Sequence, residues 1–141
     1  MRRWRSASAA ETEAVGHELA AELAPDGVLL LAGGLGAGKT VLVRGLAAGL
    51  GIAVSEIQSP TFTLMRSHQG GSCSLLHVDL YRLEPADIPD IGLEEALYGA
   101  GVKAVEWAER LPFSVPGALH LELRRGRHGD EREIVETDGR T

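Results

Sequence analysis

Residues 33–40 constrain the fold more than any other part of the chain, because they read G-x-x-x-x-G-K-T. A compact apolar run at residues 28–32 precedes them and is short enough for a buried strand. Residues 41–50 follow with apolar side chains at helical spacing, and Gly51 is a suitable stop for that helix. Strand, glycine loop and helix are the context that a phosphate-binding loop requires, so we predict a nucleotide site here.

The residue types of this loop fit the chemistry of phosphate binding. Glycines let backbone N–H groups turn inward around phosphate oxygens, and the positive end of a helix dipole begins near Gly38. Lys39 would reach the β- and γ-phosphates, and the hydroxyl of Thr40 would bind Mg²⁺. Of the 14 Lys and Arg residues only Lys39 and Lys103 are lysines, so a lysine in the loop indicates that a compact ammonium is needed.

The composition indicates one ordinary domain spanning residues 1–141, with residues 1–7 flexible and 138–141 as a tail. With 44% hydrophobic and 24% charged residues the chain should bury its own core. The lone cysteine, Cys73, excludes an internal disulfide framework. Because no apolar run reaches the roughly 20 residues of a membrane span, and no apolar segment follows the basic start, we expect a cytoplasmic protein. The net charge of −6 argues against direct binding to nucleic acid, which needs a basic face.

Further elements are predicted on either side of the loop. Ser8 and Glu11 have the spacing of a capping box and would start a helix that ends before Pro25. Residues 59–64 alternate like a half-exposed strand, and residues 74–79 return after a glycine-rich turn, which predicts a β-hairpin.

The second half of the chain supplies the remaining elements. Residues 85–89 are expected to be a loop and residues 93–97 a short helix. Residues 119–123 and 133–136 alternate as a second hairpin. We therefore predict an α/β fold: a single P-loop NTPase-like domain whose mixed sheet has parallel core strands and antiparallel hairpins and is flanked by helices.

Two predicted strands end in an acidic residue, Asp79 and Glu106. A carboxylate at such a place can simply cap the next loop. Downstream of a phosphate loop, however, it can also hold Mg²⁺ or position the attacking water. We interpret both as site residues.

Arginines cluster between the last two predicted strands, at Arg124, Arg125, Arg127 and Arg132. They could border the nucleotide, or they could solvate an edge strand. Both interpretations remain open at this point.

Four motifs follow one another along the chain: G-G-L-G-A-G-K-T, S-P-T-F-T-L, H-V-D-L-Y-R-L and V-E-W-A-E-R. This succession resembles the TsaE family of bacterial P-loop ATPases, also called YjeE, over nearly the whole chain and at the family's spacings. Many families share the phosphate loop alone, whereas D-L-Y-R-L together with S-P-T-F and E-W is highly specific.

The resemblance implies a function and a set of partners. The family takes part in making threonylcarbamoyladenosine in tRNAs that read codons starting with A. It uses ATP and Mg²⁺, its partners are TsaB and TsaD, and tRNA is reached through that complex.

The resemblance also implies roles for individual residues. Thr40, Asp79 and Glu106 would form the metal site, and Lys39, Asp79 and Glu106 would be catalytic. Trp107, beside Glu106, could pack in the core or contact the nucleotide or a partner. Together with the loop pattern and the arginine cluster, this gives the following nucleotide-binding candidates: Thr12, Gly33, Leu35, Gly36, Ala37, Gly38, Lys39, Thr40, Val41, Thr61 and Arg132.

Two positions depart from the family pattern. Gly34 stands where the family usually has Asp, and Val41 stands where a second hydroxyl residue is common. The Lys39–Thr40 pair is retained, so we expect nucleotide binding to survive.

Two other functions fit parts of the sequence. A small P-loop kinase of a metabolite or nucleoside would need an arginine-bearing lid, for which only residues 124–127 are available. A pure nucleotide switch would order a surface for partners without turnover. A GTPase is disfavoured because no Asn-Lys-x-Asp motif is present.

Overall fold

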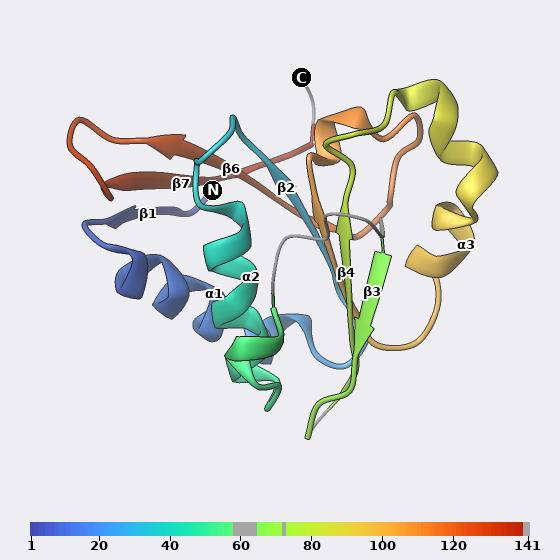
Figure 1. Cartoon of the computed structure of the whole chain (residues 1–141), viewed down its shortest axis with the longest axis horizontal. Coiled ribbons are helices and arrows are strands. Elements are labelled where there is room, and N and C mark those ends of the chain that lie inside the picture. Colours follow the sequence, from blue (N-terminus) through green and yellow to red (C-terminus); the bar gives the residue numbers. More distant parts are fainter. Residues whose placement is uncertain (58–64, 72, 140–141) are drawn as a thin grey trace.

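A mixed sheet runs through the centre of the molecule in the computed structural model, which describes residues 1–57, 65–71 and 73–139 (Figure 1). The strands, in spatial order, are β1 (Arg3–Ser6), β7 (Arg132–Thr137), β6 (Leu119–Arg125), β2 (Val28–Ala32), β5 (Val102–Glu106), β4 (Leu75–Asp79) and β3 (Met65–His68). Strands β6, β2, β5 and β4 are parallel, and the pairs β1–β7, β6–β7 and β3–β4 are antiparallel. The predicted parallel core with antiparallel hairpins is confirmed.

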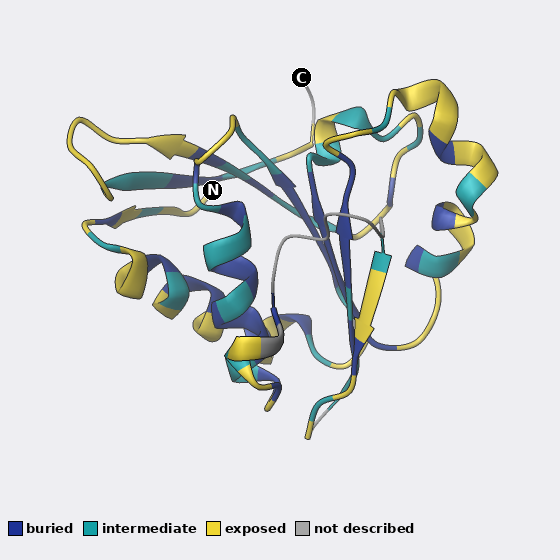
Figure 2. Cartoon of the chain, viewed as in Figure 1, coloured by how far each residue is buried: buried dark blue, intermediate teal, exposed yellow. Residues whose placement is uncertain are grey.

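Strand β2 is apolar along its length because both faces of the sheet are covered at this point. Leu29 and Leu31 pack toward α1 (Ala9–Leu23) and α2 (Lys39–Gly49). Val28 and Leu30 belong to a second cluster on the opposite face, which includes Leu93 and Leu97 of α3 (Leu93–Leu97). Figure 2 shows the result, with buried central strands between helices whose outer sides are exposed.

Three glycines allow α1 and α2 to pack with their backbones close together. A Cβ added at Gly16 would lie 2.8 Å from the backbone nitrogen of Leu46, and one added at Gly45 would lie 2.6 Å from the carbonyl carbon of Glu13. At Gly49 a Cβ would lie 2.5 Å from that of Ala20. This tight packing fixes α2, and with it the phosphate loop, on the sheet.

The helix start predicted at Ser8 is confirmed. The Ser8 hydroxyl accepts a hydrogen bond from the backbone N–H of Glu11 at 3.2 Å. The Glu11 carboxylate reaches one residue further back than a capping box requires and accepts from the backbone N–H of Ala7, also at 3.2 Å.

The structure differs from the sequence-based expectations at the start of the chain. Residues 1–7 were expected to be flexible, yet residues 3–6 form β1 and pair with β7. Backbone pairing orders this segment, and ion pairs of Arg2 with Glu136 at 2.9 Å and of Arg3 with Glu133 at 3.7 Å accompany it.

The expected loop at residues 85–89 is wrong, because Pro85–Ile91 forms a 3-10 helix. Pro85 presets the backbone for a helical first turn, and Glu84 and Asp87 cap that turn reciprocally. The fully buried side chain of Ile88 anchors it to the core. Two further 3-10 helices are Val54–Glu56 and Ala108–Arg110.

The return strand of the first predicted hairpin is confirmed as β4, and its antiparallel partner is β3, which begins at Met65. The first strand predicted at residues 59–64 lies outside the described residues. The second hairpin is confirmed, with β6 extending to Arg125 and β7 starting at Arg132. Within the described ranges, no helix combines the length and apolar character needed to cross a bilayer.

The helix contact predicts a destabilising effect of Gly45→Ala. In an exposed helix this change would raise the free energy of unfolding by about 1 kcal/mol, because alanine has a higher helix propensity than glycine. Here the new Cβ meets the backbone of Glu13, so we expect a loss of about 1–3 kcal/mol in the free energy of unfolding, measured by urea denaturation. Gly71→Ala, outside any helix, is a control for the clash alone, since a Cβ there meets nothing within 4 Å. A more stable Gly45→Ala protein would contradict this packing.

Candidate nucleotide-binding and metal site

The phosphate loop connects the end of β2 to the start of α2 and depends on glycine for its shape. Gly33, Gly36 and Gly38 have φ values of 144°, 71° and 101°, which side chains with a Cβ rarely adopt. Gly38 is also the N-cap of α2, so the first free N–H groups of the helix begin directly after the loop. Successive N–H groups in this conformation form a concave surface for anions.

Lys39 turns back over the loop. Its Nζ donates hydrogen bonds to the carbonyl oxygens of Gly33 and of Gly34, the latter at 2.9 Å, and lies 4.1 Å from the centre of the Trp107 ring. The residue is only 5% exposed. Burial lowers the pKa of Lys39 below its ordinary value, while the nearby carboxylates of Glu106, Glu109 and Asp79 oppose that shift. The ammonium is therefore held where a phosphate anion would stabilise its charge.

Thr40 and the two strand-end acids lie together beside Lys39. Thr40 Oγ1 lies 2.9 Å from both carboxylate oxygens of Glu106 and donates to that carboxylate. Asp79 ends β4 directly opposite Glu106 in the parallel register of β4 and β5, and its Oδ1 accepts from the backbone N–H of Tyr81 at 2.9 Å. The two acids that the sequence analysis placed at strand ends therefore lie side by side at the same end of two parallel strands.

The donor set at this edge suits Mg²⁺. One hydroxyl and two carboxylates offer only oxygen ligands, which Mg²⁺ prefers. Across the described ranges, no group of three or more His, Cys, Asp or Glu side chains could hold a metal. A metal at Thr40 and Glu106 would therefore complete its shell with phosphate oxygens and water, as Mg²⁺ commonly does.

Aromatic and cationic side chains enclose the site beyond Lys39. Trp107 has φ 60° and is the only described non-glycine residue with a positive φ, a conformation that costs about 1–3 kcal/mol. Its ring lies 5.0 Å from that of Tyr81, and the Arg110 guanidinium lies 5.2 Å from the Trp107 ring. Arg110 also donates to the Leu83 carbonyl at 2.8 Å. Tyr81 and Arg110 were not among the site residues predicted from the sequence, although Tyr81 lies in the motif H-V-D-L-Y-R-L and Arg110 in V-E-W-A-E-R.

The β6–β7 hairpin brings two arginines to the phosphate loop. Arg132 Nη2 donates to the carbonyl of Gly36 at 3.0 Å, and Arg125 Nη2 donates to that of Leu35 at 3.3 Å. Arg124 pairs instead with Glu122 at 2.9 Å. The arginine cluster therefore divides between the loop and the strand surface.

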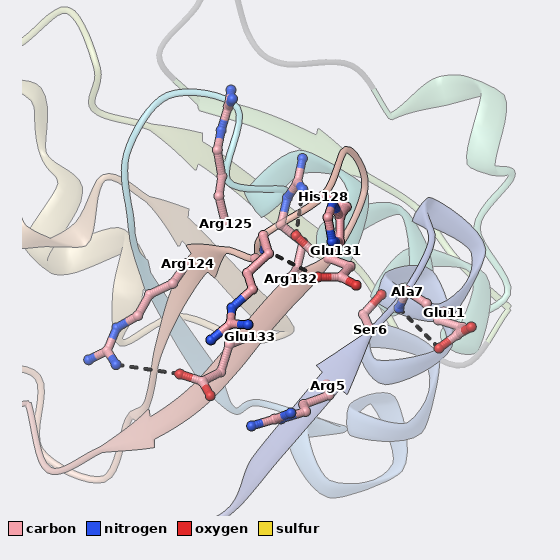
Figure 3. Close-up of a pocket in the computed structure, with 12 residues that line it drawn as sticks. Arg5, Ser6, Ala7, Glu11, Arg124, Arg125, His128, Glu131, Arg132 and Glu133 are labelled. Atoms are coloured by element: carbon pink, nitrogen blue, oxygen red, sulfur yellow. Dashed lines mark hydrogen bonds and ion pairs between the residues drawn. The ribbon is translucent and has the colours of Figure 1, made fainter.

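A cavity of about 780 Å³ lies between this hairpin and the N-terminal segment (Figure 3). In Figure 3, side chains from β6, β7 and their connecting turn line one side of it, and the start of the chain lines the other. The lining residues are Arg5, Ser6, Ala7, Glu11, Arg124, Arg125, Gly126, Arg127, His128, Glu131, Arg132 and Glu133.

The remaining described nucleotide-binding candidates lie in the phosphate loop, in α2 and in α1. Leu35 is 65% exposed at the tip of the loop, whereas Ala37 is buried beneath it and Val41 lies in the first turn of α2. Thr12 is 2% exposed and its Oγ1 lies 2.7 Å from the hydroxyl of Ser6, so it supports the cavity wall from behind. Thr61 lies outside the described residues.

Comparison with known proteins agrees with this architecture. The model of the family described as "Threonylcarbamoyl adenosine biosynthesis protein TsaE" matches residues 6–134. The tRNA threonylcarbamoyladenosine biosynthesis protein TsaE of Bacillus subtilis is 41% identical over 136 residues, covering 96% of this chain and 84% of that protein. The protein of the same name from Treponema pallidum is 46% identical over 112 residues, covering 79% and 82%.

The fold of a solved structure matches as well. The crystal structure of YdiB from Bacillus subtilis superposes with a TM-score of 0.73 at 37% identity, covering 96% of this chain and 83% of that one. The chain therefore belongs to the TsaE family of threonylcarbamoyl adenosine biosynthesis proteins, as its four motifs predicted.

Proposed function

We propose that this chain binds and hydrolyses ATP with Mg²⁺, and that it does so as a component of the machinery that makes threonylcarbamoyladenosine in tRNAs reading codons that start with A. One observation carries the ATPase proposal: the Thr40 hydroxyl contacts Glu106 at 2.9 Å directly beside the buried ammonium of Lys39. Family membership and the shared names of the relatives support the role in tRNA modification.

The triphosphate would bind the loop between β2 and α2. Backbone N–H groups of the loop and of the α2 start would donate to the phosphate oxygens. Lys39 would exchange its bonds to the carbonyls of Gly33 and Gly34 for bonds to the β- and γ-phosphates. A phosphate anion would favour the charged form of Lys39, against the burial that lowers its pKa.

Hydrolysis would use the two strand-end acids. Thr40 and Glu106 would hold Mg²⁺, which when bound neutralises charge on the phosphates, with Asp79 at the edge of that site. Glu106 would also orient or deprotonate the attacking water, because its carboxylate is 3% exposed and fixed on Thr40. Trp107 would keep bulk water away from Lys39.

The base and ribose would occupy the cavity between the β6–β7 hairpin and the N-terminal segment. Its volume of about 780 Å³ lies within the ordinary range of small-molecule sites. Arg132 belongs both to the cavity wall and to the phosphate loop, through its bond to Gly36, so one ligand could span the two.

TsaB and TsaD are the proposed partners, in the cytoplasm, and tRNA would be reached only through them. The net charge of −6 favours a protein partner over bare nucleic acid. We expect the two partner proteins to stimulate a slow ATPase activity of this chain.

Phosphate release from ATP and Mg²⁺, with and without the TsaB–TsaD pair, tests the proposed function. We expect slow release by the chain alone and strong stimulation by the pair. Multiple-turnover tRNA modification that proceeds equally well without this chain would refute the role. A phosphorylated acceptor in place of free phosphate would identify a kinase.

Lys39→Ala should abolish productive ATP binding. Losing one hydrogen bond from a charged group costs about 1.5–3 kcal/mol, so affinity should fall at least about 10- to 100-fold, measured by calorimetry. Some stability should be lost as well, because the carbonyls of Gly33 and Gly34 lose their donor.

Lys103→Ala is the matched control for this experiment. Lys103 Nζ donates to the carbonyls of Asp26 and Gly99 at 3.0 and 2.6 Å, at the opposite end of β5 from Glu106. We expect this variant to lose stability and to keep its ATP affinity. Wild-type ATP turnover in Lys39→Ala would refute the site assignment.

Glu106→Gln and Asp79→Asn should keep nucleotide binding and lose turnover, because each keeps the side-chain shape and removes the charge. Binding is read by calorimetry and turnover by phosphate release. If both variants instead misfold and bind no nucleotide, the two acids serve the structure and not the reaction.

A further inference from the structure

His77 is a buried side chain that the proposed mechanism has not used. It lies on β4 with an exposed fraction of 0%, and its Nε2 is 2.6 Å from Oε2 of Glu106. We propose that His77 is a positioning residue whose Nε2–H holds the Glu106 carboxylate in the orientation that faces Thr40. This inference rests on the proposed function, since it assigns a role within the same site.

The strand pattern explains why these two side chains meet. Residues i and i+2 of a strand share a face, so His77 points to the same side of the sheet as Asp79. In the parallel register of β4 and β5, Asp79 is opposite Glu106 and His77 is opposite Ala104. His77 and Glu106 are therefore diagonal neighbours on the face that carries α2, within reach of a long side chain.

Hydrogen bonding identifies which ring nitrogen carries the proton. Nδ1 of His77 is buried and has no hydrogen-bond partner in the part of the chain that is described. A proton on Nδ1 would leave a buried N–H donor unpaired, which costs more than leaving a ring acceptor unpaired. We therefore assign the proton to Nε2, which donates it to the acceptor-only carboxylate of Glu106.

The carboxylate of Glu106 is consequently held from two sides. Thr40 Oγ1 donates from the phosphate loop, and His77 Nε2 donates from the neighbouring strand. Both donors act on a group that has almost no contact with solvent, where each bond is stronger than in water. With His77 fixing its orientation, Glu106 would keep its remaining lone pairs available to Mg²⁺ and to the attacking water. Such supporting contacts around metal ligands commonly change activity about 10- to 100-fold when removed.

A positioning role predicts a change in turnover without a change in ATP affinity. His77 is fully buried behind Glu106 and cannot touch the nucleotide itself. Removing its donor should let the carboxylate rotate, which affects the reaction more than binding of the ground state.

Two substitutions separate this role from packing. The amide nitrogen of His77→Gln can reach the position of Nε2, whereas that of His77→Asn reaches only as far as Nδ1. We expect kcat for ATP hydrolysis, measured with the partner proteins present, to fall about 10- to 100-fold in His77→Asn and to stay near the wild-type value in His77→Gln. The ATP dissociation constant should be unchanged in both. Wild-type kcat in His77→Asn, or equal losses of kcat in both variants alongside equal losses of stability, would overturn the inference.

Nitrogen-15 NMR of the histidine-labelled wild-type chain gives a second, activity-independent test. We expect the His77 proton on Nε2, with a resonance that moves when Glu106→Gln is introduced. A proton on Nδ1 would overturn this inference and leave the proposed function standing. A wild-type chain that releases no phosphate from ATP even with its partners would overturn the proposed function itself.

Discussion

The buried charge of Lys39 sets the conditions that the surrounding structure must meet. An ammonium removed from water is costly unless other groups replace its hydration. Here the carbonyls of Gly33 and Gly34 accept its hydrogen bonds, the Trp107 ring offers its negative face, and the carboxylate of Glu106 lies nearby. In the proposed function Lys39 would exchange the two carbonyls for phosphate oxygens, and Glu106 would serve the metal site and the reaction. The groups that compensate the buried charge of Lys39 are therefore also groups of the proposed site.

Parallel strands bring these groups together. Strand β2 delivers the loop, and β5 and β4 deliver Glu106 and Asp79 to the same edge of the sheet. The close packing of α1 against α2 through Gly16, Gly45 and Gly49 then prevents the loop from moving away from that edge. The 2.9 Å contact between the Thr40 hydroxyl and the Glu106 carboxylate requires α2 and β5 to keep a fixed separation.

The sequence predicts the parts of this protein that follow from local chemistry or period. The phosphate loop can be recognised in the sequence because its glycines, lysine and threonine stand at fixed spacing. Asp79 and Glu106 can be recognised because each ends an apolar run. The His77 contact depends on the register of β4 with β5, which no local pattern gives, although its place two residues before Asp79 does indicate the shared face. The positive φ of Trp107, whose ring lies beside Tyr81 and Arg110, likewise has no local signal in the sequence.

Strand β1 lies in a segment that the sequence predicted to be flexible, yet it pairs with the strand that carries Arg132. Ser6 of β1 is opposite Arg132 of β7, and Arg132 is opposite Arg125 of β6. These two arginines hold the loop carbonyls of Gly36 and Leu35. Pairing of β1 with β7 also covers what would otherwise be an open edge beside the cavity. Two strand pairings thus connect β1 to the arginines that contact the phosphate loop, although β1 and the loop lie roughly thirty positions apart in the chain.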